Sequence, residues 1–390
     1  MKIYNVRINT MDGGKIIENG YIEIENGKIS AVCEGIPVKT DTSDIDGQGW
    51  LLVPGFIDPH SHIGIIENGI DFEGDDCNES TDPFTPQMRT IDGINPFDRC
   101  FEEAYTRGIT SAVVCPGSAN PCGGEIYAVK TYGRRVDDMA IKKVGIKFAL
   151  GENPKNVYND RDETPITRMA SAALIREGLF RAKKYMDMKS RHENDPENCD
   201  EPEFDIKSEA LIPLFRGEAD AHFHCHRADD IFTALRIGKE FGINVVLVHA
   251  TEGHLVADIL GEEKAKAISG PIICDRCKPE MKALEISNTH ELHKNGVLVS
   301  ICTDHPVIPI QYLPMSAAMA IKGGLDEQTA LEAITINAAR TAGIDNITGS
   351  ITPGKDADIQ LYSGSPLDIM NEPELVMING KIIKGDSKNA

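Results

Sequence analysis

The 390-residue sequence contains no apolar run long enough to cross a membrane and no excess of positive charge. A membrane-spanning helix needs about 20 consecutive apolar residues, and no stretch of this chain approaches that length. Lysine and arginine number 40 against 61 aspartates and glutamates, which gives a formal net charge of −21. A field of this sign repels phosphate backbones and anionic lipid surfaces. These features predict a protein that binds neither nucleic acid nor membranes.

The chain also lacks the apolar core of a signal peptide and the cysteine spacing of a disulfide framework. It starts MKIYNVRINTMDGGKII, in which polar residues interrupt every short apolar run. Ten cysteines scattered over this length indicate reduced thiols. With 41% apolar and 26% charged residues, the composition is typical of a globular protein with a substantial core. We expect a soluble cytoplasmic protein that acts on a small-molecule substrate and forms homo-oligomers.

Both ends of the chain carry strand patterns with hairpin signals. Short alternations of apolar and polar residues fill residues 1–50, and Asn26-Gly27 separates two of them. The pattern returns from Thr348 onward, where Asn379-Gly380 separates two further apolar runs. Each piece is too short for a core of its own. We therefore expect both to pair into one small discontinuous β-sandwich domain, residues 1–50 with 347–390.

Residues 51–346 alternate short apolar runs with helical patterns. Eight candidate strands, each followed by a possible crossover, predict an α/β protein built on a (β/α)8 TIM barrel. Residues 165–189 form the clearest amphipathic helix, with Thr164 as its expected N-cap, and the acidic segment 191–205 predicts a solvated loop. The candidate strands are 55–59, 110–115, 127–131, 144–150, 220–224, 244–249, 270–274 and 297–302.

Ligand-type side chains follow four of these candidate strands. His60 and His62 in PGFIDPHSHIG are two residues apart, so a strand points both imidazoles to the same face. His224 in AHFHCH, His249 in VVLVHA and Asp304 in VSICTDHP also follow apolar runs. Barrel enzymes build their sites where the carboxyl ends of the strands meet. The pattern predicts a metal centre with one or two divalent ions, most naturally Zn²⁺, with Mn²⁺ or Fe²⁺ as alternatives.

The sequence resembles the amidohydrolase superfamily of metal-dependent hydrolases over nearly its whole length. The resemblance is carried by LVPGFIDPHSHI, residues 52–63, and by LEAITINAARTAGIDNITGSITPGKDADIQL, residues 331–361. Among subgroups, the chain is most similar to those of imidazolonepropionase and prolidase-like enzymes. The resemblance implies a (β/α)8 barrel with a small β-sandwich made from both termini. It also implies a set of metal ligands, which are His60, His62, His224, His249 and Asp304.

Two positions in this ligand set leave alternatives open. His222, His224 and His226 alternate along the fifth candidate strand. The resemblance of HCHRADDIFTAL to the family favours His224 as the ligand, keeps His222 as its rival, and lets His226 face the substrate. On the fourth strand, GIKFALGENPK offers Lys147, which many binuclear members carboxylate, and Glu152, which matches members that use a glutamate. We favour Glu152 as the metal ligand because it lies at the strand end beside a glycine, whereas Lys147 falls within the strand.

The expected reaction is metal-dependent hydrolysis of a C–N amide-type bond in a cyclic amide, an N-acyl group or a dipeptide-like molecule. A bound divalent ion lowers the pKa of water toward about 7. Asp304 would take a proton from this water as a general base and return it to the leaving nitrogen as a general acid. The metal, together with His249 or His226, would polarise the scissile carbonyl.

Arg227 bears on the choice between this reaction and ring deamination, the alternative on the same scaffold. Deaminases of this scaffold typically carry a glutamate three residues after the fifth-strand histidine, where this chain has Arg227. We expect Arg227 to bind a substrate carboxylate, with a salt bridge to Asp229 or Asp230 as the alternative. A non-catalytic binding protein with the same fold is a third hypothesis. The retention of all main ligand positions speaks against it.

Overall fold

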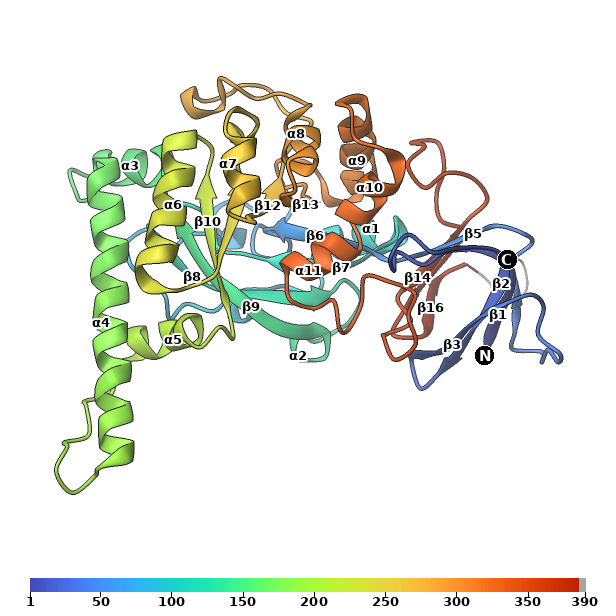
Figure 1. Cartoon of the computed structure of the whole chain (residues 1–390), viewed down its shortest axis with the longest axis horizontal. Coiled ribbons are helices and arrows are strands. Elements are labelled where there is room, and N and C mark those ends of the chain that lie inside the picture. Colours follow the sequence, from blue (N-terminus) through green and yellow to red (C-terminus); the bar gives the residue numbers. More distant parts are fainter. Residues whose placement is uncertain (386–390) are drawn as a thin grey trace.

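In the computed structural model, which describes residues 1–385, the strands form two eight-stranded sheets (Figure 1). The strands of one sheet come from both ends of the chain, and those of the other come from its middle. The terminal sheet consists of β1 (Lys2–Asn9), β2 (Ile16–Glu25), β3 (Lys28–Glu34), β4 (Ile45–Asp46), β5 (Leu51–Pro54), β14 (Ile359–Tyr362), β15 (Leu375–Ile378) and β16 (Lys381–Lys384).

The terminal sheet contains both predicted hairpins. The β2–β3 turn at Asn26-Gly27 and the β15–β16 turn at Asn379-Gly380 have positive φ angles of 52°, 80°, 50° and 72°, as a two-residue type I′ turn requires. The two turns touch, because a Cβ atom on Gly380 would lie 2.6 Å from Cα of Gly27. The strands follow one continuous order, β16-β15-β14-β5-β1-β2-β3 with β4 beside β1. The order includes β5, so this sheet runs past residue 50; that it folds as a separate sandwich domain stays a prediction.

The second sheet is a nearly closed barrel whose strands follow one another in chain order. Its strands are β6 (Phe56–Ser61), β7 (Ile109–Val114), β8 (Cys122–Lys130), β9 (Ala140–Ala149), β10 (Asp220–Cys225), β11 (Val245–His249), β12 (Lys266–Ser269) and β13 (Leu298–Ile301). Just beyond β13, the chain reaches the end of β6. The backbone N–H of Asp304 donates to the carbonyl oxygen of His60 at 3.3 Å, and the N–H of His62 donates to that of His305 at 2.9 Å.

The barrel departs from the regular (β/α)8 pattern that the sequence predicts. Strand β8 runs antiparallel to both β7 and β9. The reason is the short connection 115–121 between β7 and β8, since a parallel return needs a crossover of a dozen residues or more. The seventh strand is also displaced, because β12 ends at Ser269 and the predicted strand 270–274 is the loop that follows it. The result is a mixed α/β fold in which one barrel strand is reversed.

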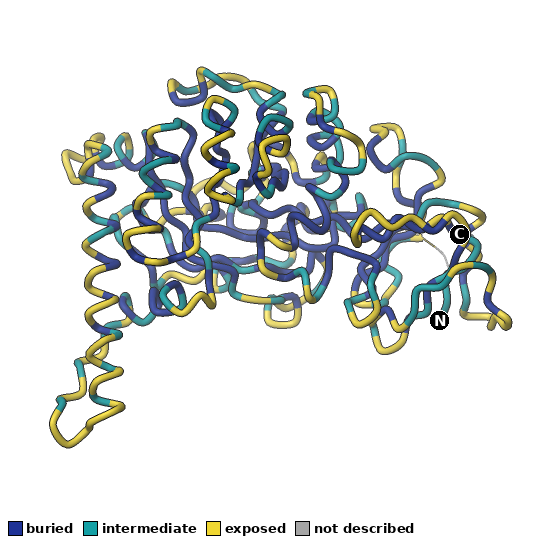
Figure 2. Tube along the Cα trace, viewed as in Figure 1, coloured by how far each residue is buried: buried dark blue, intermediate teal, exposed yellow. Residues whose placement is uncertain are grey.

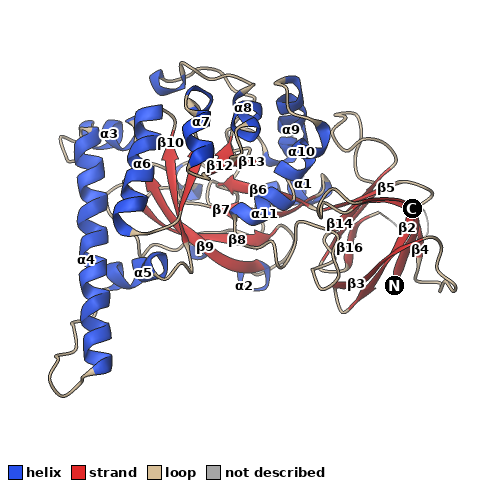
Figure 3. Cartoon of the chain, viewed as in Figure 1, coloured by secondary structure: helices blue, strands red, loops and turns tan. Residues whose placement is uncertain are grey.

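Helices cover the outside of the barrel sheet (Figure 3). The longest is α4, which extends beyond the barrel and becomes exposed along its second half (Figure 2). It begins after Thr167, whose hydroxyl accepts the N–H of Ala170, and not after Thr164 as predicted. Among the described residues, no helix combines the length and apolarity needed to cross a bilayer. The helices are α1 (Arg99–Thr106), α2 (Val136–Met139), α3 (Glu152–Asn159), α4 (Arg168–Asn194), α5 (Ile206–Phe215), α6 (Ala228–Phe241), α7 (Ala257–Glu262), α8 (Asn288–Lys294), α9 (Leu313–Lys322), α10 (Glu327–Ala333) and α11 (Ile336–Thr341).

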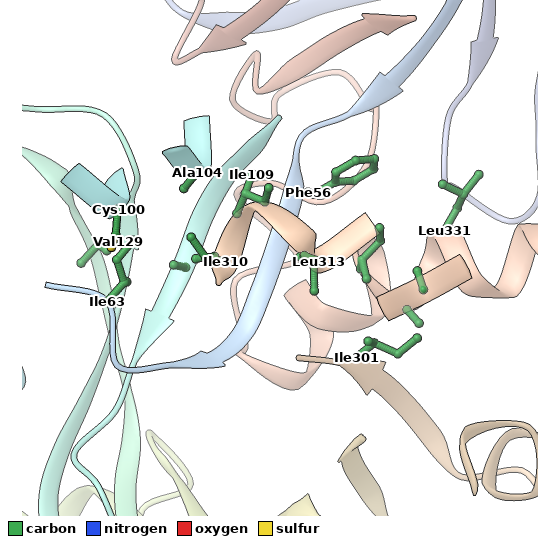
Figure 4. Close-up of a cluster of buried hydrophobic side chains, with 14 of the residues drawn as sticks. Phe56, Ile63, Cys100, Ala104, Ile109, Val129, Ile301, Ile310, Leu313 and Leu331 are labelled. Atoms are coloured by element: carbon green, nitrogen blue, oxygen red, sulfur yellow. The ribbon is translucent and has the colours of Figure 1, made fainter. Parts of the chain in front are cut away.

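A buried apolar cluster packs the first barrel strands against the helices that follow the last one (Figure 4). Phe56 of β6, Ile109 of β7 and Leu313 of α9 are all fully buried in it. Burying a side chain of this size stabilises the fold by about 1.5 to 3 kcal/mol. The cluster therefore holds β6, which carries the first two candidate ligands, in a fixed position.

Candidate metal centre

Six ligand-type side chains gather in two groups at the carboxyl ends of the barrel strands. The first group is His60, His62 and Asp304, and the second is His224, His226 and His249. Within each group, the ligand atoms lie within 4.8 Å of one another. The ring centroid of His249 lies 5.5 Å from that of His60 and 4.6 Å from that of His224. The two groups are thus neighbours, and both line one cavity of about 420 Å³.

Hydrogen bonds orient three of these imidazoles. The Nδ1–H group of His62 donates to the carbonyl oxygen of Cys115 at 2.7 Å. The Nδ1–H group of His249 donates to that of Gly270 at the same distance. Nδ1 of His226 lies 2.6 Å from a threonine hydroxyl. These contacts occupy Nδ1 of each ring, so Nε2 is the nitrogen that can bind a metal.

The protonation states of His60, His249 and Asp304 suit a divalent ion. His62 differs, because Cys77 and Asp304 outweigh the effect of burial and raise its pKa to about 10. Burial lowers the pKa of His249 to about 4, and burial together with Lys147 lowers the pKa of His60 well below its usual value. Burial alone would raise the pKa of Asp304, but the surrounding histidines hold it well below its usual range. Its Oδ1 lies 3.3 Å from Nε2 of His60 and 3.4 Å from Nε2 of His62. Neutral imidazoles and an ionised carboxylate are the forms that bind metal.

Two of the candidate ligands have left-handed backbone conformations. His249 has a φ of 72°, Ala250 after it a φ of 44°, and Asp304 a φ of 54°. Few residues other than glycine adopt this region, and holding one there costs of order 1–3 kcal/mol. Both ligands lie where the chain leaves a strand, and both line the cavity. Strain that the surrounding structure maintains is typical of functional sites.

Asp58 connects the first and last barrel strands beneath the first group, and the sequence analysis did not assign it. Its carboxylate accepts the backbone N–H of His60 at 3.2 Å and both the N–H and the hydroxyl of Thr303. Because Thr303 precedes Asp304, Asp58 holds the two ligand-bearing segments together. Burial raises the pKa of Asp58 to about 7. The sequence contained a signal for Asp58 as a site residue, because Asp58 lies two residues before His60 and so shares its strand face.

The structure brings Lys147, and not Glu152, to the ligand groups. Lys147 is buried, and its Nζ lies 3.2 Å from Nε2 of His60. Strand β9 ends at Ala149, and the left-handed turn at Gly151 redirects the chain into α3. Glu152 begins that helix, and its side chain neither lines the cavity nor joins a ligand group. Glu152 therefore lies apart from both ligand groups in this structure, and its role as a metal ligand stays a prediction.

His222, the rival of His224, lies deeper inside the barrel. It pairs in register with Lys147 on the neighbouring strand, and it is fully buried. Neither of its ring nitrogens has a hydrogen-bond partner among the described residues. His224 and His226 line the cavity, whereas His222 does not. The geometry thus favours His224 as the fifth-strand ligand.

Replacing His222 with leucine is expected to leave the metal content unchanged and to raise the free energy of unfolding by about 1 kcal/mol. A buried polar group without a partner costs about 1 to 3 kcal/mol, and leucine removes this cost. Elemental analysis and urea unfolding measure the two effects. His224→Leu is the comparison variant, and it is expected to lose metal. Loss of metal from the His222→Leu protein instead would identify His222 as a ligand.

Arg227 lies outside the cavity. It precedes α6, and its guanidinium donates from Nε and Nη2 to the two carboxylate oxygens of Asp229, each at 2.9 Å. The structure thus contains the salt bridge with Asp229 that the sequence left open as the alternative, and the substrate-binding role of Arg227 stays a prediction. The physical reason is that the chain turns into α6 directly after His226, which places Arg227 beside the first turn of that helix.

Two charged residues from the loop after β12 enter the site, and the sequence analysis missed both roles. Oε1 of Glu280 lies 3.8 Å from Nε2 of His224 and 3.7 Å from Nε2 of His226. Lys278 lines the cavity, and its Nζ lies 3.0 Å from the same oxygen and 3.2 Å from Oδ1 of Asn153. No motif links these positions to the histidines, because only the path of the loop brings them together.

Comparison with known proteins shows which family the chain resembles. The family model described as the amidohydrolase family matches residues 215–383. The chain is 38% identical to an amidohydrolase from Thermotoga maritima MSB8, whose crystal structure matches 99% of this chain and 100% of that one with a TM-score of 0.94. It is 25% identical to the imidazolonepropionase of Geobacillus thermodenitrificans, over 97% of this chain and 93% of that protein.

A further relative is longer than this chain. Amidohydrolase tasK of Hapsidospora irregularis is 30% identical over 93% of this chain, and the match spans 39% of that protein. Together with the fold and the two ligand groups, these similarities define the class of protein. The chain belongs to the amidohydrolase superfamily of metal-dependent hydrolases.

Proposed function

We propose that this protein hydrolyses a C–N amide-type bond in a small molecule, which is a cyclic amide, an N-acyl compound or a dipeptide-like substrate. The observation that carries the proposal is the position of Asp304. Its ionised carboxylate lies beside two ligand imidazoles and lines a cavity of about 420 Å³. Cavities of this size hold small molecules. A small-molecule substrate also agrees with the strongly negative net charge, which disfavours nucleic acid as a partner.

The residues present fit one or two divalent ions, with Zn²⁺ as the first choice. The first group offers two imidazoles and a carboxylate, and the second offers three imidazoles. When bound, such an ion supplies a water of lowered pKa and polarises the carbonyl of the scissile bond.

Asp304 carries the proton transfers in this proposal. As a general base, its carboxylate takes a proton from the attacking water. As a general acid, it returns that proton to the leaving nitrogen, so amide hydrolysis needs no second acid. His249 acts on the substrate carbonyl only through the metal, because its Nδ1–H donates to the carbonyl oxygen of Gly270 and its unprotonated Nε2 can bind the ion but cannot donate a hydrogen bond.

Lys278 is a second candidate, beside Arg227, for binding a substrate carboxylate. Its ammonium lines the cavity, and its side chain is 23% exposed. A substrate carboxylate entering the cavity would meet this charge, in a contact that contributes about 1.5 to 3 kcal/mol. We therefore expect substrates that carry a carboxylate.

Ring deamination is the second candidate function. Arg227 stands where deaminases of this scaffold typically carry a glutamate, which speaks against this function. The structure brings the carboxylate of Glu280 to the same histidines from a different loop. A carboxyl group at this place can deliver a proton to a ring nitrogen, which a guanidinium cannot do near neutral pH.

A substrate panel at fixed Zn²⁺ separates these functions. The purified protein is expected to cleave carboxylate-bearing N-acyl compounds, cyclic amides or dipeptides, as detected by mass spectrometry of the products. The same panel contains purines and pyrimidines, with ammonia release as the readout. Ammonia release without cleavage of any acyl or cyclic amide would establish the deaminase. Metal-loaded protein that binds panel members but converts none would instead support a non-catalytic binding protein.

A further inference from the structure

The second half of α4 and the loop that follows it form an arm, residues 180–205, that extends beyond the barrel (Figure 1). Most of this arm is exposed (Figure 2). One side of its helix packs on α5, where the hydroxyl of Tyr185 donates to Glu209 at 2.6 Å. None of its residues lines the cavity of the candidate metal centre. The arm therefore presents a surface that the proposed reaction does not use.

The outer face of the arm's helix carries positive charge in a chain whose net charge is −21. A groove of about 330 Å³ runs along this face, and its side chains recur every three or four residues, as one helix face requires. Three of them are cations without an ion-pair partner among the described residues, whereas Lys189 on the other face pairs with Glu209. The groove is lined by Phe180, Lys183, Lys184, Asp187, Met188 and Arg191.

The loop at the end of the arm carries the opposite charge. Residues 195–205 contain six carboxylates and no lysine or arginine. Glu197, Glu201 and Glu203 are exposed, and none of them forms an ion pair within residues 1–385. Phe204 follows them and is 71% exposed. An exposed aromatic side chain of this kind is a frequent anchor of protein–protein interfaces.

Within one chain, the acidic loop does not reach the basic groove. Nδ1 of His192 lies 2.7 Å from the carbonyl oxygen of Cys199, which ties the loop to the last turn of α4. The carboxylate of Asp205 then accepts the N–H of Lys207 at the start of α5. Because α5 packs on the face of α4 opposite to the groove, the loop returns on that opposite side. The groove cations and the loop carboxylates thus both stay open.

We propose that the arm is a contact between two copies of this chain, in which the groove on each α4 receives the acidic loop of the other copy. The contact is reciprocal, so it closes around a twofold axis. The groove rises about 16 Å from Phe180 to Arg191. The segment from Glu197 to Glu203 can extend over about 20 Å, which is enough to cover it. This contact would form the homo-oligomer that the sequence predicts.

The charges favour a second copy as the occupant. Two chains with a net charge of −21 repel each other, so a contact between them needs local charges of opposite sign. The groove provides them for the loop of the partner, and Phe204 then meets the apolar side chains of Phe180 and Met188. Nucleic acid is disfavoured, because the carboxylates at the end of the same arm repel phosphates. A contact of this kind weakens as salt screens it.

The test is sedimentation velocity of the full-length protein at concentrations up to about 100 µM, where a dimer with a micromolar Kd is largely formed. The parent is expected to dimerise in about 50 mM NaCl and to dissociate progressively toward about 500 mM. Two charge-reversal variants are expected to weaken the dimer by at least about tenfold each. The groove variant carries Lys183→Glu, Lys184→Glu and Arg191→Glu, and the loop variant carries Glu197→Lys, Glu201→Lys and Glu203→Lys.

Mixing the two variants gives the decisive measurement. In the mixed dimer, the acidic groove of one chain meets the basic loop of the other, and the basic groove of the second meets the acidic loop of the first. The equimolar mixture is therefore expected to dimerise about as the parent does. This recovery also shows that both variants are folded, which circular dichroism checks independently. The control carries the same change of charge at exposed lysines outside the arm, and it should dimerise as the groove variant does not; its substitutions are Lys15→Glu, Lys264→Glu and Lys294→Glu.

Four results would overturn the proposal. The parent stays a monomer at about 100 µM, or the folded groove variant dimerises as the parent does. The mixture of the two variants recovers no dimer, which would show that groove and loop do not meet. A single-stranded oligonucleotide binds the parent and not the groove variant, which would assign the groove to nucleic acid. None of these readouts depends on metal or turnover, so the proposed function stands or falls separately.

Discussion

Asp304→Asn is expected to lower kcat by about 100- to 10,000-fold, the usual contribution of general acid–base catalysis. Asparagine preserves the shape of the side chain but accepts no proton from water. The carboxylate of Asp304 lies beside both His60 and His62, and among the described residues it is the one acid in the first ligand group. Steady-state kinetics measure the effect. Because Asp304 is also a candidate metal ligand, the assay is run at saturating Zn²⁺, so that weaker metal binding does not lower kcat.

Two further variants make this experiment specific. Asp200→Asn changes an exposed aspartate in the loop after α4, and it should keep kcat within about twofold of the parent. His60→Ala removes a ligand from the same group and should abolish turnover together with metal binding at that group. Full hydrolytic activity in metal-free protein, or in Asp304→Asn, would contradict the proposed mechanism.

Lys130→Met is expected to lower the free energy of unfolding by about 3 to 5 kcal/mol, the cost of breaking a buried ion pair. Lys130 lies on β8 and its side chain is 5% exposed. Its Nζ lies 3.0 Å from Asp356 and 2.5 Å from Asp358, in the segment that leads into the terminal sheet. The carboxylate of Asp358 is fully buried and also accepts the N–H of Asn379. Without the ammonium, two carboxylates would face each other where the barrel meets the terminal sheet.

Lys28→Met is the matched control for this loss of stability. Lys28 also pairs with Asp356, at 2.8 Å, but its side chain is 55% exposed. An exposed pair contributes about 0 to 1 kcal/mol, so the control should unfold nearly as the parent does. Urea unfolding followed by circular dichroism compares the two proteins. An equal loss of unfolding free energy in the two variants would show that burial does not set the strength of the ion pair between Lys130 and the two aspartates.

Features that depend on residues close together in the chain could be predicted from the sequence. The two hairpins follow from Asn26-Gly27 and Asn379-Gly380, since a two-residue turn needs only its own residues to adopt positive φ. His60 and His62 share a face because a strand repeats every two residues. The strand-end positions of His249 and Asp304 followed from the end of each apolar run. These local rules, with the resemblance of two motifs, were sufficient to identify the superfamily.

Which side chains meet across the barrel could be known only from the folded chain. Lys147 reaches His60 although it lies within its strand, because the inner face of a barrel brings neighbouring strands together. Glu152 and Arg227 looked suitable by spacing, but each lies where the chain turns into a helix and leaves the cavity. Glu280 approaches the second histidine group only through the path of the loop after β12. Contacts of this kind depend on where loops run in three dimensions, which the periodicity of strands and helices does not encode.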